Sequence, residues 1–371
     1  MSTADDKTLL YQIAITLLPG VGDINARKLI AYTGSPEAVF TESRANLLRI
    51  PGMGDATVDL IMGNRHVVER AGKEVGFVRK YGIRTTFYTD QEYPERLRHC
   101  IDSPVLIFML GTADLNKARI VSIVGTRRAT EYGKEICRKL VSGLTGHDVL
   151  IVSGMAYGID TCAHKAALDE GLQTVGVFAH GLDRVYPSLN NTLAQRMVGQ
   201  GGLVTEFISE TNPDRENFPR RNRVIAGLAD ATIVIEAGIK GGALITADIA
   251  NSYNRDVFAV PGRIGDPVSE GCNNLIKTNR AALVQSAADI CYIMGWDKTQ
   301  SNRSPVQRSL FINLEPDQER VVAILHENGD SSLDKICLAS GIQTSKVAAA
   351  LLGLEFEGIV KCLPGKIYRL L

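Results

Sequence analysis

The sequence predicts an α/β protein built around a doubly wound, mostly parallel sheet, and two observations support this prediction. Short apolar runs such as Ile120–Val124 and Val149–Val152 alternate with longer segments that have helical periodicity. Glycine-rich segments follow several of these runs, where the loops of such a sheet bind ligands. The length of 371 residues and the hydrophobic content of 45% allow two or three domains with large cores.

Residues 1–80 are expected to form a helical unit that contains an internal repeat. The segments Leu18–Gly22 and Ile50–Gly54 both read as L/I-P-G-x-G and both precede a helical run. This is the helix-hairpin-helix pattern of a SAM-like domain, in which a G-x-G turn can present backbone N–H groups to a phosphate. Few basic residues lie near either turn, so two turns that only pack remain an open alternative.

Residues 81–296 contain the strands of an expected extended Rossmann-like domain. The run Val105–Leu110 is expected to join the sheet ahead of the others. The further strand candidates are Ile120–Val124, Val149–Val152, Thr174–Ala179, Leu203–Phe207, Thr232–Ile235, Val257–Val260 and Leu283–Val284. Continuous apolar runs are typical of parallel strands, because helices cover both faces of such a sheet.

The end of the chain predicts a linker and a small domain. Residues 297–314 are assigned to a linker, because Asp297–Pro305 is polar and lacks apolar periodicity. Residues 315–371 are expected to form a winged helix. Its elements would be helices at Asp317–Glu327, Leu333–Ala339 and Thr344–Phe356 and a hairpin from Ile359 to Leu370. Winged helices bind either DNA or a protein. The third helix offers few Arg, Asn or Gln side chains to base edges, so a protein partner remains an open alternative to DNA.

Composition limits the functions that the chain can have. The 41 Lys and Arg residues balance 41 Asp and Glu residues, so nucleic-acid binding needs a local basic patch. The seven cysteines include no C-x-x-C pair, which argues against a zinc site and fits a reducing compartment. Asp5 and Asp6 stand where a signal peptide has basic residues, and no apolar run is long enough to span a membrane. A cytoplasmic protein without membrane contact or bound metal is therefore expected.

An anion site is predicted where the first strands of the sheet end. The run Ile120–Val124 is followed by Gly125-Thr126-Arg127-Arg128, and the next run leads into Ser153-Gly154. Glycines let backbone N–H groups approach an anion, and the following helix N-terminus adds its dipole. The loop lacks the second glycine of the dinucleotide fingerprint, and the chain lacks a P-loop, so no NAD, ATP or other cofactor is expected.

A second cationic cluster begins a later helix, with the sequence Asn217-Phe218-Pro219-Arg220-Arg221-Asn222-Arg223. Asn217 can cap this helix and Pro219 suits an early helical position. Three arginines at a helix N-terminus oppose the macrodipole and therefore cost helix stability. Residues placed against their local preference indicate a function. Both clusters follow strands and should meet at one edge of the sheet. There the arginines would bind phosphates, and Phe218 or Tyr186 would stack on a base.

The order of these motifs resembles the DNA-processing protein A family, DprA, also called Smf. The resemblance rests on GTRRATEYG, SGMAYGIDTCAHKAAL, HGLDRVYPSLN, TEF, NFPRRNRVIAGL, IEAGIKGGALITA and AVPGR. It implies an extended Rossmann fold that binds single-stranded DNA without catalysis. It also implies that the protein protects incoming DNA in natural transformation, helps load the RecA recombinase and forms a homodimer through the Rossmann domain. The apolar segments Ala247–Tyr253 and Leu275–Lys277 are candidate dimer contacts.

The resemblance carries family residues onto positions of this chain. The Gly-x-Arg loop falls on Gly125 and Arg127, and the Arg-Asn-Arg motif begins at Arg221. One motif departs from the family, because Lys240-Gly241-Gly242-Ala243 stands where many relatives have Ser-Gly-Ser/Thr, so Lys240 is expected to substitute for the missing hydroxyl groups. The expected DNA-binding residues are Gly125, Thr126, Arg127, Arg128, Ser153, Gly154, Phe218, Arg220, Arg221, Asn222, Arg223, Lys240, Gly241 and Gly242.

The alternative function is a nucleotide hydrolase of the phosphoribohydrolase kind, which also uses a glycine-rich Rossmann pocket. Such enzymes have P-G-G-x-G-T-x-x-E, but Ile249 stands where the Glu is expected. Asp160, Glu206 and Glu236 are the remaining candidate acids, although capping or pairing with arginine explains them as well. No nucleophile–base pair is readable from the spacing, so no catalytic residue is assigned.

Overall fold

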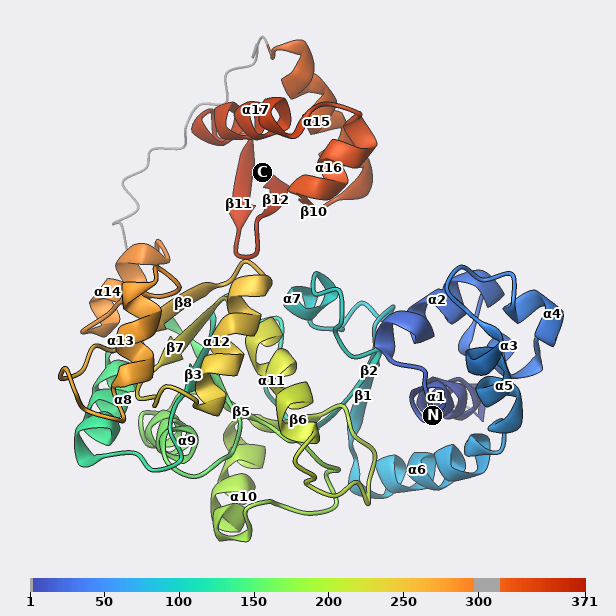
Figure 1. Ribbon diagram of the computed structural model, residues 1–371, viewed down its shortest axis with the longest axis horizontal. Coiled ribbons are helices and arrows are strands. Elements are labelled where there is room, and N and C mark those ends of the chain that lie inside the picture. The colour runs from blue at the N-terminus through green and yellow to red at the C-terminus, as the bar shows by residue number, and fades with distance from the viewer. Residues whose placement is uncertain (1–2, 297–313) are drawn as a thin grey trace.

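The computed structural model of the protein describes residues 3–296 and 314–371. A helical unit at the N-terminus and a winged helix at the C-terminus flank a central α/β domain (Figure 1). This arrangement confirms the predicted fold class. The predicted linker at 297–314 lies, except for its last residue, outside the described residues.

Six helices form the N-terminal unit around buried side chains such as Leu29, Leu47 and Ile61. The helices are α1 (Thr3–Thr16), α2 (Asp23–Thr33), α3 (Pro36–Thr41), α4 (Arg44–Leu47), α5 (Asp55–Gly63) and α6 (Val67–Tyr81). As the repeat predicted, α2 and α5 each begin directly after a G-x-G turn. The core of this unit extends to Phe87 and Phe108 of the central sheet, so the unit packs against the edge of that sheet.

The central sheet has nine strands in the order β1-β2-β6-β5-β4-β3-β7-β8-β9. They are β1 (Arg84–Phe87), β2 (Leu106–Gly111), β3 (Ile120–Val124), β4 (Leu150–Ser153), β5 (Thr174–Val177), β6 (Gly202–Thr205), β7 (Ala231–Val234), β8 (Asp256–Ala259) and β9 (Ala282–Leu283). The strands from β3 to β9 pair in parallel, whereas β2 runs antiparallel to β1 and β6. All predicted strands are present, with ends moved by at most two residues, and β1 is the strand that the sequence pattern missed.

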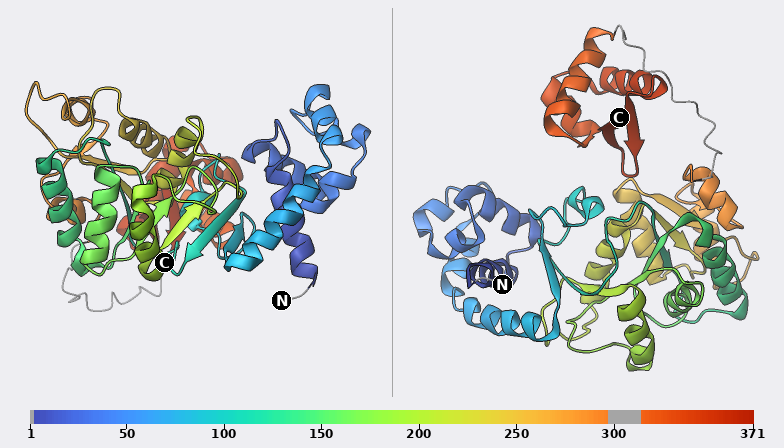
Figure 2. Two further views of the ribbon diagram at one scale, coloured as in Figure 1. Left: turned by 90° about the horizontal axis from the view of Figure 1, so that it is seen from below. Right: turned by 180° about the vertical axis from the view of Figure 1, so that it is seen from behind.

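Helices cover both faces of the sheet (Figure 2). The helices α11, α12 and α13 pack with α7 on the face that carries Val124 and Val152. The helices α8, α9 and α14 pack on the opposite face, against Ile123 and Ile151. The helices of this domain are α7 (Glu95–Arg98), α8 (Glu131–Gly143), α9 (Ile159–Asp169), α10 (Asn191–Gln200), α11 (Asn217–Leu228), α12 (Gly242–Ser252), α13 (Glu270–Lys277) and α14 (Ala287–Ile293), with short 3-10 turns at Thr145–His147 and Ser188–Asn190.

The strands β3 and β7 are neighbours from which the chain proceeds in opposite directions. From β3 the chain continues through β4 and β5 to β6 on one side, and from β7 it continues through β8 to β9 on the other. The topological switch point therefore lies between the carboxyl ends of β3 and β7. Open α/β sheets bind their ligands at such a point.

The C-terminal unit is a winged helix, as predicted. The helices α15 (Pro316–Asn328), α16 (Leu333–Ser340) and α17 (Thr344–Phe356) enclose a small apolar core. The strands β11 (Val360–Leu363) and β12 (Ile367–Leu370) form the wing, and β10 (Ser331–Ser332) adds a third strand that was not predicted. The tip of the wing, between β11 and β12, lies against the central domain (Figure 1). There Arg255 donates a 2.8 Å hydrogen bond to the carbonyl oxygen of Pro364.

Across residues 3–296 and 314–371, no single helix has the length and apolar composition that a membrane span requires. The pair α16 and α17, bent by 114°, meets those two criteria jointly. Both helices contribute buried residues to the core of the winged helix.

Candidate nucleic-acid interface

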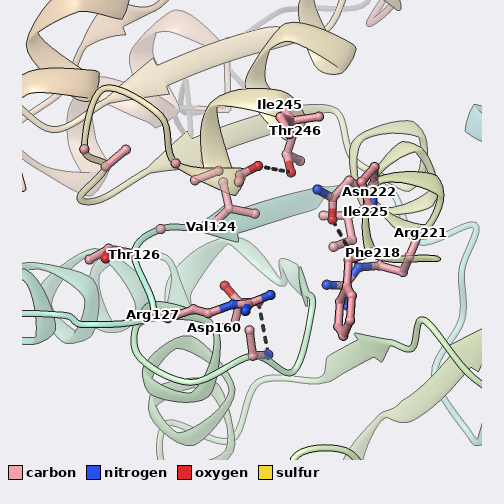
Figure 3. A pocket seen from close by; sticks show the side chains of 18 of the residues that line it. Val124, Thr126, Arg127, Asp160, Phe218, Arg221, Asn222, Ile225, Ile245 and Thr246 are labelled. Carbon is pink, nitrogen blue, oxygen red and sulfur yellow. Dashed lines mark hydrogen bonds between the residues drawn. The ribbon is translucent and has the colours of Figure 1, made fainter. Parts of the chain in front are cut away.

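A pocket of about 430 Å³ opens at the switch point between β3 and β7 (Figure 3). The loop after β3 forms one wall, and the first turns of α11 and α12 form the others. Nine predicted site residues line it: Gly125, Thr126, Arg127, Arg128, Phe218, Arg221, Asn222, Gly241 and Gly242. The fold thus brings three loops that are distant in the sequence to one cavity.

Two arginines lie against the same aromatic ring inside the pocket. The guanidinium carbons of Arg127 and Arg221 are 5.4 and 5.9 Å from the ring centroid of Phe218. Arg127 extends from the loop after β3 towards this ring (Figure 3). Burial lowers the pKa of Arg221 to about 10, and the positive charge of Arg127 adds to this effect while Asp160 opposes it. Two guanidinium groups of like charge therefore meet at the Phe218 ring.

Arg221 forms the floor of the pocket and is only 5% exposed. Its Nη1 donates hydrogen bonds to the carbonyl oxygens of Gly154 and Val177, and its Nε donates to Oδ1 of Asn222 at 3.2 Å. These bonds tie α11 to the ends of β4 and β5. Arg221 therefore holds the pocket together in addition to charging it, which the sequence alone did not indicate.

Asp160 lies beside Arg221 at the start of α9 and is buried. Its carboxylate accepts a 3.2 Å hydrogen bond from the backbone N–H of Ala156. Burial raises the pKa of Asp160 to about 6, although Arg221 and nearby hydrogen bonds oppose this effect. Gly154 allows the close approach, because a Cβ there would lie 2.7 Å from the Arg221 guanidinium and from Oδ2 of Asp160.

Five predicted site residues lie outside the pocket lining: Ser153, Gly154, Arg220, Arg223 and Lys240. Ser153 is fully buried, and its hydroxyl donates a 2.5 Å hydrogen bond to the carbonyl oxygen of Ile123. Lys240 is exposed and directly precedes Gly241, the N-cap residue of α12. Ser153 therefore acts on the packing of the sheet, whereas Lys240 lies next to the pocket residues Gly241 and Gly242.

The arginines of α11 point in different directions. Arg223 is nearly buried and forms ion pairs with Glu206 and, at 3.1 Å, with Asp23 of the N-terminal unit. Arg220 lies 5.2 Å over the Phe207 ring and 3.4 Å from the same Glu206 carboxylate. Residues three apart in a helix share a face. The spacing of Arg220 and Arg223 therefore indicates that their side chains lie on a different face of α11 from the side chain of Arg221.

The expected cap of α11 is wrong. Glu216 occupies the N-cap position, and Asn217 is the first helical residue. The side chain of Asn217 instead donates a 3.1 Å hydrogen bond to the carbonyl oxygen of Asn212. Tyr186, the other predicted stacking residue, is half exposed with its ring centroid 6.2 Å from that of Phe218.

The N-terminus of α12 is open towards the pocket. A Cβ added to Gly242, the first residue of this helix, would meet no atom within 4 Å. Packing within the protein therefore does not require a glycine at position 242. A ligand that approaches the backbone closely would require one. The sequence motifs did not single out Ile245 and Thr246, which line the pocket from the next turn of α12.

The candidate acids have structural partners. Glu236 accepts hydrogen bonds from the backbone N–H and the hydroxyl of Thr130, and Glu206 pairs with Arg223. Asp160 is held as described above. In the part of the chain that the structure describes, no group of three or more His, Cys, Asp or Glu side chains could hold a metal ion.

Comparison with known families decides the identity. Residues 84–295 match the model of the DNA recombination-mediator protein A, and residues 308–366 match the DprA winged helix domain. The chain belongs to the DprA family. It is 30% identical to the DprA-family protein Smf of Synechocystis, and the match covers 97% of this chain and 98% of that protein.

Solved DprA structures have the same fold. The crystal structure of Streptococcus pneumoniae DprA matches 76% of this chain and 97% of its own, with 34% identity and a TM-score of 0.67. A Helicobacter pylori DprA structure that concerns the single-stranded DNA binding mode of that protein matches 57% of this chain and 95% of its own, with 27% identity and a TM-score of 0.52. Membership of the DprA family assigns this chain to DNA processing and recombination.

Proposed function

We propose that this chain binds single-stranded DNA in the pocket between β3 and β7 and acts without catalysis. The observation that carries the proposal is the shared contact of Arg127 and Arg221 with the Phe218 ring. Two guanidinium groups provide charge for phosphates, and the ring provides a surface on which any base can stack. The single-stranded DNA binding of the Helicobacter pylori relative supports the same interpretation.

The pocket suits single strands better than duplexes. A base must leave its stack to reach Phe218, and this costs more free energy in a duplex, where a base pair must also break, than in a single strand. In this proposal Arg127, Arg128 and Lys240 contact phosphates, while Gly241 and Gly242 bring backbone N–H groups close to one. The remaining predicted residues form or support the loops that carry these groups, with Arg220 and Arg223 beside the N-terminal unit.

Binding without turnover is the simplest use of these groups. Ile249, a partly buried side chain against the core, occupies the position of the glutamate that a phosphoribohydrolase would use. The three candidate acids Asp160, Glu206 and Glu236 are buried. Glu206 and Glu236 are already bonded to neighbouring side chains, and Asp160 lies beside Arg221.

In the family's setting, the bound strand would be protected and handed to the RecA recombinase during transformation and recombination. A homodimer of the central domain would let two pockets hold one strand with greater avidity. The dimer contact that we expected from Ala247–Tyr253 and Leu275–Lys277 needs correction. Ala247, Ala250 and Leu275 are buried in the core of the domain, so these three side chains cannot form the contact.

The test is a titration of labelled oligothymidylate and of a duplex of equal length at several salt concentrations. Binding should favour the single strand at every salt concentration, with a negative salt slope. Equal affinity for the duplex would remove the proposal. In parallel, nucleotides and DNA incubated with the protein and magnesium should release no base, sugar or phosphate. Any release that is lost in Glu206→Gln or Glu236→Gln would instead favour the hydrolase.

A further inference from the structure

A second cavity of about 350 Å³ lies on the side of the sheet that α8 and α9 cover. Lys134 and Arg138 of α8 and Lys165 of α9 line it, together with Tyr157 from the loop before α9. Asp169 is the acidic residue in its lining, and the carboxylate of Asp169 pairs with Arg196 at 2.8 Å. The cavity therefore combines three cations and one aromatic ring.

This cavity borders the first pocket. The loop that carries Tyr157 lies directly against the Arg127 loop, because a Cβ on Gly158 would overlap the carbonyl oxygen of Thr126. The backbone N–H of Ile159 also donates a 3.2 Å hydrogen bond to that oxygen. Arg127 and Arg128 are exposed where the two loops meet. A DNA strand that leaves the first pocket past these arginines therefore reaches Tyr157 next.

The cations of the second cavity are available to a ligand. Arg138 and Lys165 form no ion pair with any other described residue, and Lys134 pairs only with the exposed Glu131. Exposed pairs of this kind contribute at most about 1 kcal/mol, so a phosphate can replace the carboxylate. The thiol of Cys162 lies in the same lining as these cations. Its hydrogen bond with Cys137 lowers the pKa of its thiol, and Arg138, Lys134 and Lys165 lower it further against the effect of burial.

We propose that this second cavity is a further subsite for the same DNA strand, and the proposal rests on the function proposed above. The strand would pass Arg128, stack one base on Tyr157 and place its phosphates against Lys134, Arg138 and Lys165. Tyr157 is 44% exposed and so presents a ring to a base without rearrangement of the core. Alternating cations and aromatic rings are the usual means of holding a single strand without reading its sequence.

The first test compares strand lengths. The doubly substituted Arg138→Gln/Lys165→Gln protein should bind an oligothymidylate of about 16 nucleotides at least threefold more weakly than the unchanged protein. Its salt slope should fall by about 0.7 for each phosphate that the substituted side chains no longer neutralise. Affinity for about four nucleotides, which the first pocket alone can hold, should stay the same. Equal losses of affinity with both lengths, or no loss with the longer strand, would overturn the subsite.

The matched control is Lys139→Gln. Lys139 lies on the same helix α8, but it pairs with Glu135 at 2.7 Å and lines a different cavity. Its substitution removes one charge close to the subsite but none of the residues that line it. Lys139→Gln is compared with Arg138→Gln/Lys165→Gln by the loss of affinity for the longer strand per charge removed. Equal losses would show a general effect of charge and overturn the proposal.

The second test uses Cys162 as a footprint in the unaltered protein. The longer strand should slow the alkylation of Cys162 by iodoacetamide, and the short strand should not. Cys337 of the winged helix, which is also partly exposed, serves as the internal reference in peptide mass spectra. Tight binding of the long strand with no protection of Cys162 would overturn the subsite alone. Absence of binding to either strand would overturn the proposed function itself.

Discussion

Arg223 and Glu206 form a nearly buried ion pair where the N-terminal unit meets the central sheet. Asp23 adds a second carboxylate to this arginine from the first residue of α2. Burial raises the pKa of Glu206, and Arg223 is the first of the groups that oppose this effect. The pair therefore depends on both partners, and it distinguishes Arg223 from the arginines of the pocket.

Arg223→Ala should destabilise the protein rather than weaken the contact with DNA. Removal of one partner leaves an uncompensated buried carboxylate, which costs about 3–5 kcal/mol. Chemical denaturation should show this loss in the free energy of unfolding. The salt slope of DNA binding, measured on the folded fraction, should stay that of the unchanged protein. A reduced salt slope with normal stability would place Arg223 in the DNA site instead.

Arg127→Ala should have the opposite effect. Arg127 lies against the Phe218 ring and forms no ion pair with any other described residue, so the melting temperature should not change. Affinity for single-stranded DNA should fall by about 1.5–3 kcal/mol, with a salt slope lower by about 0.7. Arg127→Lys should recover part of the affinity, because an ammonium lacks the planar fork. Arg215→Ala, which removes an exposed charge outside the pocket lining, is the matched control.

Gly242→Ala should separate stability from binding. The added methyl group meets no protein atom, and alanine favours a helix, so stability should rise by about 0.4–1 kcal/mol. DNA affinity should fall, because the methyl group stands where the backbone would approach a phosphate. Gly199→Ala in α10 has equally free space and lies away from the pocket, so it should stabilise the protein without any change in binding. Unchanged affinity in Gly242→Ala would exclude α12 from the DNA contact.

DNA binding should strengthen as the pH falls through about 6, where Asp160 takes up a proton. Above this pH the carboxylate is charged and offsets Arg221, and below it the pocket gains one positive charge. Binding of a phosphate favours the protonated form, so affinity should rise by up to tenfold per pH unit through this window. Asp160→Asn should abolish this dependence. A pH profile that persists in Asp160→Asn would assign the effect to another group.

The same shift has a consequence for stability. The pKa of Asp160 is raised on folding, so its contribution to the free energy of unfolding is present below the ordinary value of about 3.8. That contribution is lost as the pH rises through about 6. His164, whose pKa burial lowers to about 3, does not titrate in this window.

The fold was largely predictable because buried parallel strands are continuous apolar runs and their carboxyl ends meet at one edge. The pattern missed β1, because Arg84-Thr85-Thr86-Phe87 is an edge strand of mixed polarity. Which arginine of α11 enters the pocket was not predictable from the motif. That depends on partners such as Asp23, which is 200 residues from Arg223 in the sequence. The inward direction of Ala247 and Ala250 likewise depends on how α12 packs against α11.

The contact between the wing and the central domain determines whether the winged helix covers the pocket. Arg255, which binds Pro364, directly precedes β8, so the wing rests at the amino end of that strand. The pocket lies beyond the carboxyl ends of β3 and β7, at the far edge of the sheet. The docked winged helix therefore does not cover the pocket, whose lining contains none of its residues. Because the winged helix is covalently tethered, it redocks after release as an intramolecular event, independent of protein concentration.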